Sequence, residues 1–168
     1  VDARDKKMLG NSYPRTVLGI DANLQYKNWG LYILGTAELG LNVWKNNAYY
    51  QNKGEGKYSV LALDRWHPEN NPNGTYPRLT TTEGENNFVN SSFWLGNGSY
   101  FRLKNVELSY TINNKKENAL AKKIKIFGRG TNLFSLSKEK DLDPELINAG
   151  INNYPVYRTL TGGVTVTF

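Results

Sequence analysis

The chain has 168 residues and a net charge of +6, with 39% hydrophobic residues, 16 glycines and no cysteine. Without cysteine, and with His67 as the single histidine, the sequence excludes disulfides, thiolate or multi-histidine metal centres and a cysteine nucleophile. The lysines and arginines are scattered and show no aromatic-basic RNA-binding pattern, so we expect no nucleic-acid partner.

The first predicted element is a strand from about residue 17 to 26. Its even positions are apolar and its odd positions are small or polar, which is the period-two pattern of a strand with two unlike faces. After residues 27–28 the alternation starts again and continues from 29 to 39. A two-residue gap between two such runs predicts a tight hairpin.

A long segment from about 40 to 99 then loses the alternation and is rich in Asn, Gly, Pro and Thr. Compact soluble domains seldom contain a loop of roughly 60 residues unless that loop has a function. We therefore predict a long functional loop here, with short local elements at most.

The alternation returns from about 100 to 112, but in two phases. Phe101 and Leu103 share one parity, whereas Val106 and the apolar residues after it have the opposite parity. A β-bulge near Lys104 and Asn105 would bring both sets to one face, because a bulge inserts one extra residue into the strand.

A short polar connection leads to a fourth strand from about 122 to 134, whose apolar face is thinned by glycines. A second long loop follows, from about 135 to 157. The last predicted strand, from about 158 to 168, alternates between apolar residues and threonines and stops on Phe168.

The predicted strands are joined in the order short, long, short, long. Transmembrane β-barrels have this order, with short turns on the inner side of the membrane and long loops on the outer side. Along each strand, successive residues face lipid and lumen in turn. Lipid cannot form hydrogen bonds with the unpaired backbone groups at the edges of an open five-stranded sheet, and bacterial single-chain barrels have at least eight strands. The expected fold is an all-β, antiparallel transmembrane β-barrel, of which residues 1–168 supply the C-terminal five strands. A soluble sandwich, whose strands also alternate, is the alternative.

The segment from Trp94 to Tyr110 and several shorter motifs resemble those near the end of SusC/RagA-like TonB-dependent outer-membrane transporters. The longest is the segment from Trp94 to Tyr110, which resembles the stretch "gsylRLkNvtLgY" of that family. Shorter matches occur in the family's order, at residues 65–70, 77–79, 131–134, 143–145 and 154–159. The resemblance covers about residues 14–168, which is nearly the whole chain.

The resemblance implies a barrel of about 22 strands in the cell outer membrane, plugged by an N-terminal domain. It implies uptake of glycans or peptides with energy from the TonB complex, while a SusD-like surface lipoprotein acts as a lid. The plug and the segment that contacts TonB are absent from this chain. Such a protein lies in the lipid bilayer, is not an enzyme and requires no cofactor.

Three groups of strand residues have expected roles. An alternating apolar row on a final strand resembles the signal read by the barrel-assembly machinery, since an unpaired edge can pair temporarily with another edge. Aromatic rings near the inner strand ends fit a membrane interface. The assembly signal would be Leu160, Val164, Val166 and Phe168. The interface aromatics would be Tyr26, Trp29, Tyr110 and Phe168. The residues that would face the lumen are Asp21, Asn23, Gln25, Arg102, Lys104, Glu107 and Arg129.

Aromatic residues in the long loops could stack on sugars, contact the lipoprotein or pack the loop against itself. The possible outer-loop contacts are Trp44, Trp66, Trp94 and Tyr157. Alternate carboxylates at Asp141, Asp143 and Glu145 raise the question of calcium, but they lack the frame of an EF-hand. His67 has no partner at a recognisable catalytic spacing.

The leading hypothesis is therefore that the chain is part of an outer-membrane TonB-dependent nutrient importer. The alternative, from another class of protein, is a secreted soluble carbohydrate-binding module of the lectin type.

Overall fold

The computed structural model describes residues 4, 6–54, 56–80, 86–114, 116 and 120–168. The chain divides into two compact units. The first comprises Val1–Tyr13, Leu41–Gly98 and Glu139–Pro155, and the second comprises Pro14–Gly40, Ser99–Lys138 and Val156–Phe168. Among the described residues no helix is long and apolar enough to cross a membrane.

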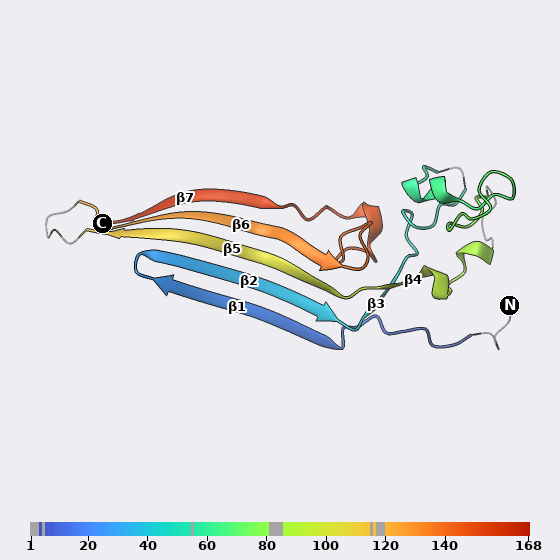
Figure 1. Cartoon of the computed structure of the whole chain (residues 1–168), viewed down its shortest axis with the longest axis horizontal. Coiled ribbons are helices and arrows are strands. Elements are labelled where there is room, and N and C mark those ends of the chain that lie inside the picture. The colour runs from blue at the N-terminus through green and yellow to red at the C-terminus, as the bar shows by residue number, and fades with distance from the viewer. Residues whose placement is uncertain (1–3, 5, 55, 81–85, 115, 117–119) are drawn as a thin grey trace. The chain divides into compact units, whose positions relative to one another are not determined.

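The second unit is one antiparallel sheet with strand order β1-β2-β5-β6-β7, so strands that pair are also neighbours along this part of the chain (Figure 1). The structure thus has a strand at each of the five expected places. β6 continues three residues beyond its expected end at 134. The strands are β1 (Thr16–Tyr26), β2 (Trp29–Leu39), β5 (Tyr100–Asn113), β6 (Lys123–Ser137) and β7 (Thr159–Thr167). Residues 115 and 117–119 of the expected short connection before β6 lie outside the described residues.

Pairing registers confirm the predicted hairpin and the predicted bulge. Tyr26 pairs with Trp29, which leaves a two-residue turn in which Lys27 has a φ of 53°. On β5, Leu103 pairs with Gly35 and Asn105 with Leu34, so Lys104 is the extra residue. The bulge therefore keeps the apolar residues before and after it on one face of the sheet.

The first unit contains the two segments that were expected to be long loops, and it has its own core. β3 (Asn42–Trp44) pairs with β4 (Leu95–Asn97), and four short 3-10 helices lie among the described residues. These helices are η2 (Val60–Asp64), η3 (Asn86–Phe88), η4 (Ser92–Trp94) and η5 (Gly150–Asn152). The buried cluster is Val43, Tyr50, Tyr76, Phe88, Trp94 and Ile147. Because Ile147 comes from the second segment, the two segments form one packed body rather than two separate loops.

Trp94 is central to this core. It is 3% exposed, its ring stacks on Phe88 with centroids 5.9 Å apart, and it meets Tyr76 edge-on at 6.1 Å. The indole Nε1 donates a hydrogen bond to the Asn87 carbonyl oxygen at 2.8 Å. A tryptophan whose only polar atom is paired can be buried without leaving an unsatisfied donor.

The two chain segments of the first unit are also joined by polar contacts. Asn47 Nδ2 donates to the Ile147 carbonyl oxygen at 2.7 Å, and Lys45 forms an ion pair with Glu139. Burial, followed by the charge of Asp141, raises the pKa of Tyr50. These contacts fix the second segment on the first.

Candidate functional site

One face of the five-stranded sheet is apolar from β1 to β7. The register places Leu24, Leu31 and Leu108 side by side, with Gly128 and Gly162 completing the row. In this sheet the only buried hydrophobic residues described are Ala37 and Tyr100. Apolar side chains are instead exposed along its whole width, including Leu24 at 59%, Leu108 at 50% and Leu160 at 78%. An exposed apolar face of this extent marks a surface that contacts a partner or a membrane.

Aromatic rings cluster at one end of this apolar face. Tyr26 pairs with Trp29, and Trp29 pairs with Tyr110. The Trp29 and Tyr110 rings meet at an angle of 60°, with centroids 4.9 Å apart. Phe168 directly follows β7 and is 76% exposed. The first three therefore form one aromatic row, the arrangement that an interfacial girdle requires.

The opposite face is polar, and it gathers the residues that were expected to face a lumen. Arg102 pairs with Thr36 and Ser135, while Glu107 pairs with Tyr32 and Arg129. Lys104 occupies the bulge. By the same register this face also holds Asp21, Asn23 and Gln25 of β1.

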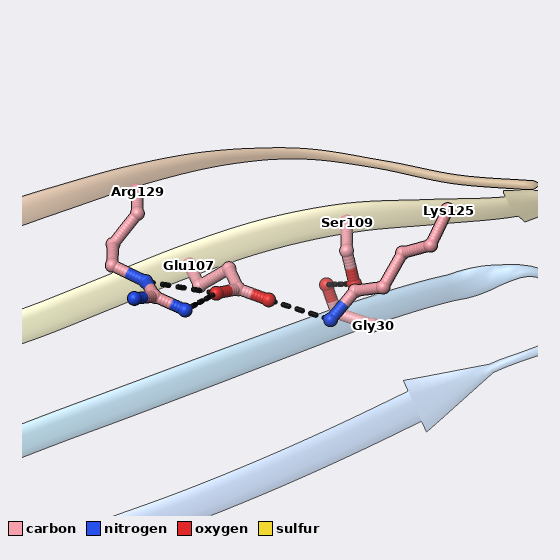
Figure 2. Close-up of polar contacts among 5 residues, drawn as sticks. All are labelled: Gly30, Glu107, Ser109, Lys125 and Arg129. Atoms are coloured by element: carbon pink, nitrogen blue, oxygen red, sulfur yellow. Dashed lines mark hydrogen bonds and ion pairs between the residues drawn. The ribbon is translucent and has the colours of Figure 1, made fainter. Parts of the chain in front are cut away.

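A charged network lies on the polar face of β5 and β6 (Figure 2). Glu107 Oε1 accepts a hydrogen bond from Lys125 Nζ at 2.7 Å. Its Oε2 accepts bonds from Arg129 Nε at 2.9 Å and Nη2 at 2.5 Å. Nearby, the Ser109 hydroxyl donates to the Gly30 carbonyl oxygen at 3.4 Å. Glu107 is 8% exposed, and two cations compensate its burial.

Phe127 is an apolar exception on the polar face. The Lys125 ammonium and the Arg129 guanidinium lie 5.8 and 5.5 Å from its ring centre. Phe127 pairs with Gly163 of β7, and a Cβ added at Gly163 would lie 2.5 Å from the ring. Because Gly163 has no side chain, the Phe127 ring can lie over its backbone. Aromatic rings often cover a strand glycine in this way. The alternation of polar and apolar residues gave no signal for this contact.

β7 is an edge strand within the described sheet, since it pairs with β6 alone. Leu160, Val164 and Val166 pair with Gly130, Ile126 and Ile124 and lie on the apolar face. They are 78%, 62% and 41% exposed. Three of the four residues expected to form an assembly signal thus make an apolar row along a strand with one open edge, and the fourth, Phe168, directly follows that strand.

The four loop aromatics have different environments. Trp94 is a core residue rather than an outer-loop contact: its ring is covered by the first unit itself, which is the self-packing alternative left open above. Trp44 packs against the same core, whereas Trp66 is 40% exposed. Tyr157 belongs to the second unit, where it is 59% exposed and its carbonyl oxygen accepts a bond from Asn132 Nδ2 at 3.3 Å.

The segment around Trp66 forms a hydrogen-bonded turn. Asp64 accepts bonds from the Thr75 hydroxyl, the Thr75 amide and Asn71, and these bonds lower the pKa of the Asp64 carboxyl group. His67 Nδ1 accepts bonds from the Glu69 and Asn70 amides at 3.2 and 3.1 Å. His67 Nδ1 is therefore used in a structural turn, where it holds two backbone amides.

The acidic segment that raised the question of calcium also forms a turn. Asp143 Oδ1 accepts a hydrogen bond from the Glu145 amide at 3.0 Å. Within the described ranges no group of three or more His, Asp or Glu side chains is placed to hold a metal ion.

Comparisons with known proteins give the class. No family model matches the chain. TonB-dependent receptors P26 and P3 of Formosa agariphila are 31% and 25% identical to it, and TonB-dependent receptor SusC of Bacteroides thetaiotaomicron is 25% identical. Each alignment covers the whole chain, which spans 18%, 18% and 16% of the length of these relatives.

The solved structures agree in fold. The RagAB peptide importer in its "closed-closed" state matches 96% of the chain with a TM-score of 0.74 and 22% identity. Its "open-open" state matches 95% with a TM-score of 0.71 and 22% identity. The chain covers 18% of each of these structures. The fold is therefore an all-β antiparallel sheet of the kind found in the barrels of TonB-dependent receptors. The chain belongs to the SusC-like TonB-dependent receptors, as a C-terminal part of such a receptor.

Proposed function

We propose that the chain forms part of the barrel wall of an outer-membrane importer that takes up oligosaccharides or peptides together with a SusD-like lipoprotein. The barrel has about 22 strands, lies in the outer membrane and receives energy from the TonB complex through a region outside this chain. The likeness to SusC and to the RagAB peptide importer supports this proposal.

The observation that carries the proposal is the two-faced sheet. The apolar face is wide and exposed, and the face behind it holds the Glu107 network and the other polar strand residues. Strands of 9 to 15 residues have the length needed to cross a bilayer at a tilt. The lumen-facing residues then line the passage or contact the plug, and the apolar face contacts lipid. A lectin-like sandwich would need a second packed sheet, and the described residues offer only the short pair β3–β4.

Deleting the gene tests this function. We expect the deletion strain to lose growth on a particular oligosaccharide or peptide from a panel of both, and a plasmid copy to restore it. The tagged protein should be recovered in the outer-membrane fraction. Unchanged growth on every nutrient, together with recovery in a soluble fraction, would contradict the proposal.

The apolar row of β7 is proposed to guide barrel assembly. We expect Phe168→Ala to lower the amount of folded protein in the outer membrane, because the assembly machinery loses an aromatic contact at an open strand edge. Phe168→Tyr keeps the ring and is the matched control. Heat-modifiable mobility on gels measures the folded fraction. If Phe168→Ala and Phe168→Tyr both reach the wild-type amount of folded protein, Phe168 has no part in assembly.

A further inference from the structure

A pocket of about 450 Å³ lies within the first unit, and no step of the proposed function yet uses it. Four carboxamide side chains, two lysines and the edge of Ile151 contribute to its wall. The carboxamides come from residues 46–52 and the lysines are Lys53 and Lys57. The volume is within the range of small-molecule sites.

Two of the carboxamides hold the wall in place. Asn47 Oδ1 accepts the Tyr49 amide at 3.0 Å, while its Nδ2 donates to Ile147 of the second segment. Asn52 Nδ2 donates to Tyr76 at 2.9 Å and to Ser59 at 3.2 Å, and its Oδ1 accepts the Ser59 amide at 2.8 Å. Asn47 and Asn52 are therefore fixed parts of the pocket wall.

Gln51 differs from these two, because its side-chain Nε2 has no hydrogen-bond partner in the structure although the residue is only 6% exposed. A buried donor without an acceptor is costly, and an acceptor supplied by a ligand would remove that cost. The terminal torsion of a glutamine is soft, so the amide can turn its NH2 group toward the pocket. After this rotation the Gln51 NH2 group would donate to an oxygen atom of a ligand in the pocket.

The charge near the pocket indicates what kind of oxygen this is. Residues 51–57 carry two lysines against one acidic residue. The Lys53 ammonium lies 5.3 Å from the centre of the Phe88 ring, and Lys57 is exposed. A carboxylate would accept the Gln51 hydrogen bond and be attracted to the ammonium groups.

We propose that this pocket binds a sugar unit that carries a carboxylate, as part of the cargo of the importer. Carboxamides both donate and accept, as sugar hydroxyls do, whereas the wall offers only Ala48 and Ile151 for the apolar side chains of a peptide. This inference rests on the proposed function, since it names the cargo class.

The test is titration calorimetry of the complete transporter in detergent with trigalacturonate. We expect binding that weakens roughly tenfold or more in Gln51→Leu and in Lys57→Gln, the loss that one hydrogen bond to a charged group implies. Lys57 is exposed, so its replacement should leave the fold intact even if Gln51→Leu does not. Lys27→Gln, in the β1–β2 hairpin of the other unit, is the matched control and should bind as the wild type does.

Two further ligands separate the alternatives. Equal binding of neutral maltotriose, or binding of triglutamate without trigalacturonate, would overturn the proposal. The same result follows if neither Gln51→Leu nor Lys57→Gln weakens binding. A transporter that restores growth in the deletion strain but does not bind trigalacturonate would refute the pocket proposal and leave the import function standing.

Discussion

Val164→Arg is expected to destabilise the sheet in a bilayer. Val164 is 62% exposed on the apolar face of β7 and pairs with Ile126. An arginine on the lipid face of a transmembrane barrel costs about 2–4 kcal/mol near the bilayer midplane. Urea titration of the transporter folded into phospholipid vesicles would measure this loss as a lower unfolding midpoint.

The neighbouring residue provides the control. Thr165 is also exposed, but the alternation of β7 places it on the polar face, where it pairs with Lys125. Thr165→Arg adds the same side chain on the aqueous side and should change the unfolding free energy much less. If both variants lose the same stability, or if Val164→Arg is tolerated, the apolar face does not contact lipid.

Short-range sequence pattern was sufficient to predict the five-stranded sheet. The period-two alternation records which residues share a face, and its change of phase between Leu103 and Val106 predicted a bulge near Lys104 and Asn105, which the structure assigns to Lys104. The family motif from Trp94 to Tyr110 pointed to the same strand. These are local signals, so each strand could be predicted from its own segment of sequence.

The sequence was less informative about the first unit, because its core is assembled from distant segments. Trp94, Tyr76 and Ile147 are far apart in the chain and share no periodic pattern. A tryptophan in a polar loop suggested a surface contact, and only the packed structure identified it as core. The same difficulty applies to Gln51, whose unpaired amide depends on the contacts that surround it.

The charged network on the polar face was predicted only in part. The alternation placed Glu107 and Arg129 on one face. It could not show that Lys125 is a second cation bound to Glu107, or that Phe127 fills the space at Gly163. Those contacts depend on the register between β5, β6 and β7. Cross-strand pairs follow from register, and register is set by the whole sheet.

The packing of the first unit fixes part of the wall of the proposed binding pocket. Asn47 contacts Ile147, Ile147 belongs to the buried cluster, and Trp94 lies in the same cluster. Disrupting this core should therefore loosen the pocket wall while the five-stranded sheet, which has separate pairings, is kept.

Trp94→Ala is accordingly expected to unfold the first unit locally. Truncation of a buried tryptophan costs about 3–5 kcal/mol, and here it also leaves the Asn87 carbonyl oxygen without its 2.8 Å hydrogen bond. Hydrogen exchange resolved by mass spectrometry should show faster exchange in peptides from 41–98 and 139–155, with the strands of the sheet unchanged. Trp66→Ala is the matched control, because Trp66 is 40% exposed and should be replaced at much smaller cost. If Trp94→Ala keeps the same protection from exchange as Trp66→Ala and the wild type, Trp94 does not hold this core together.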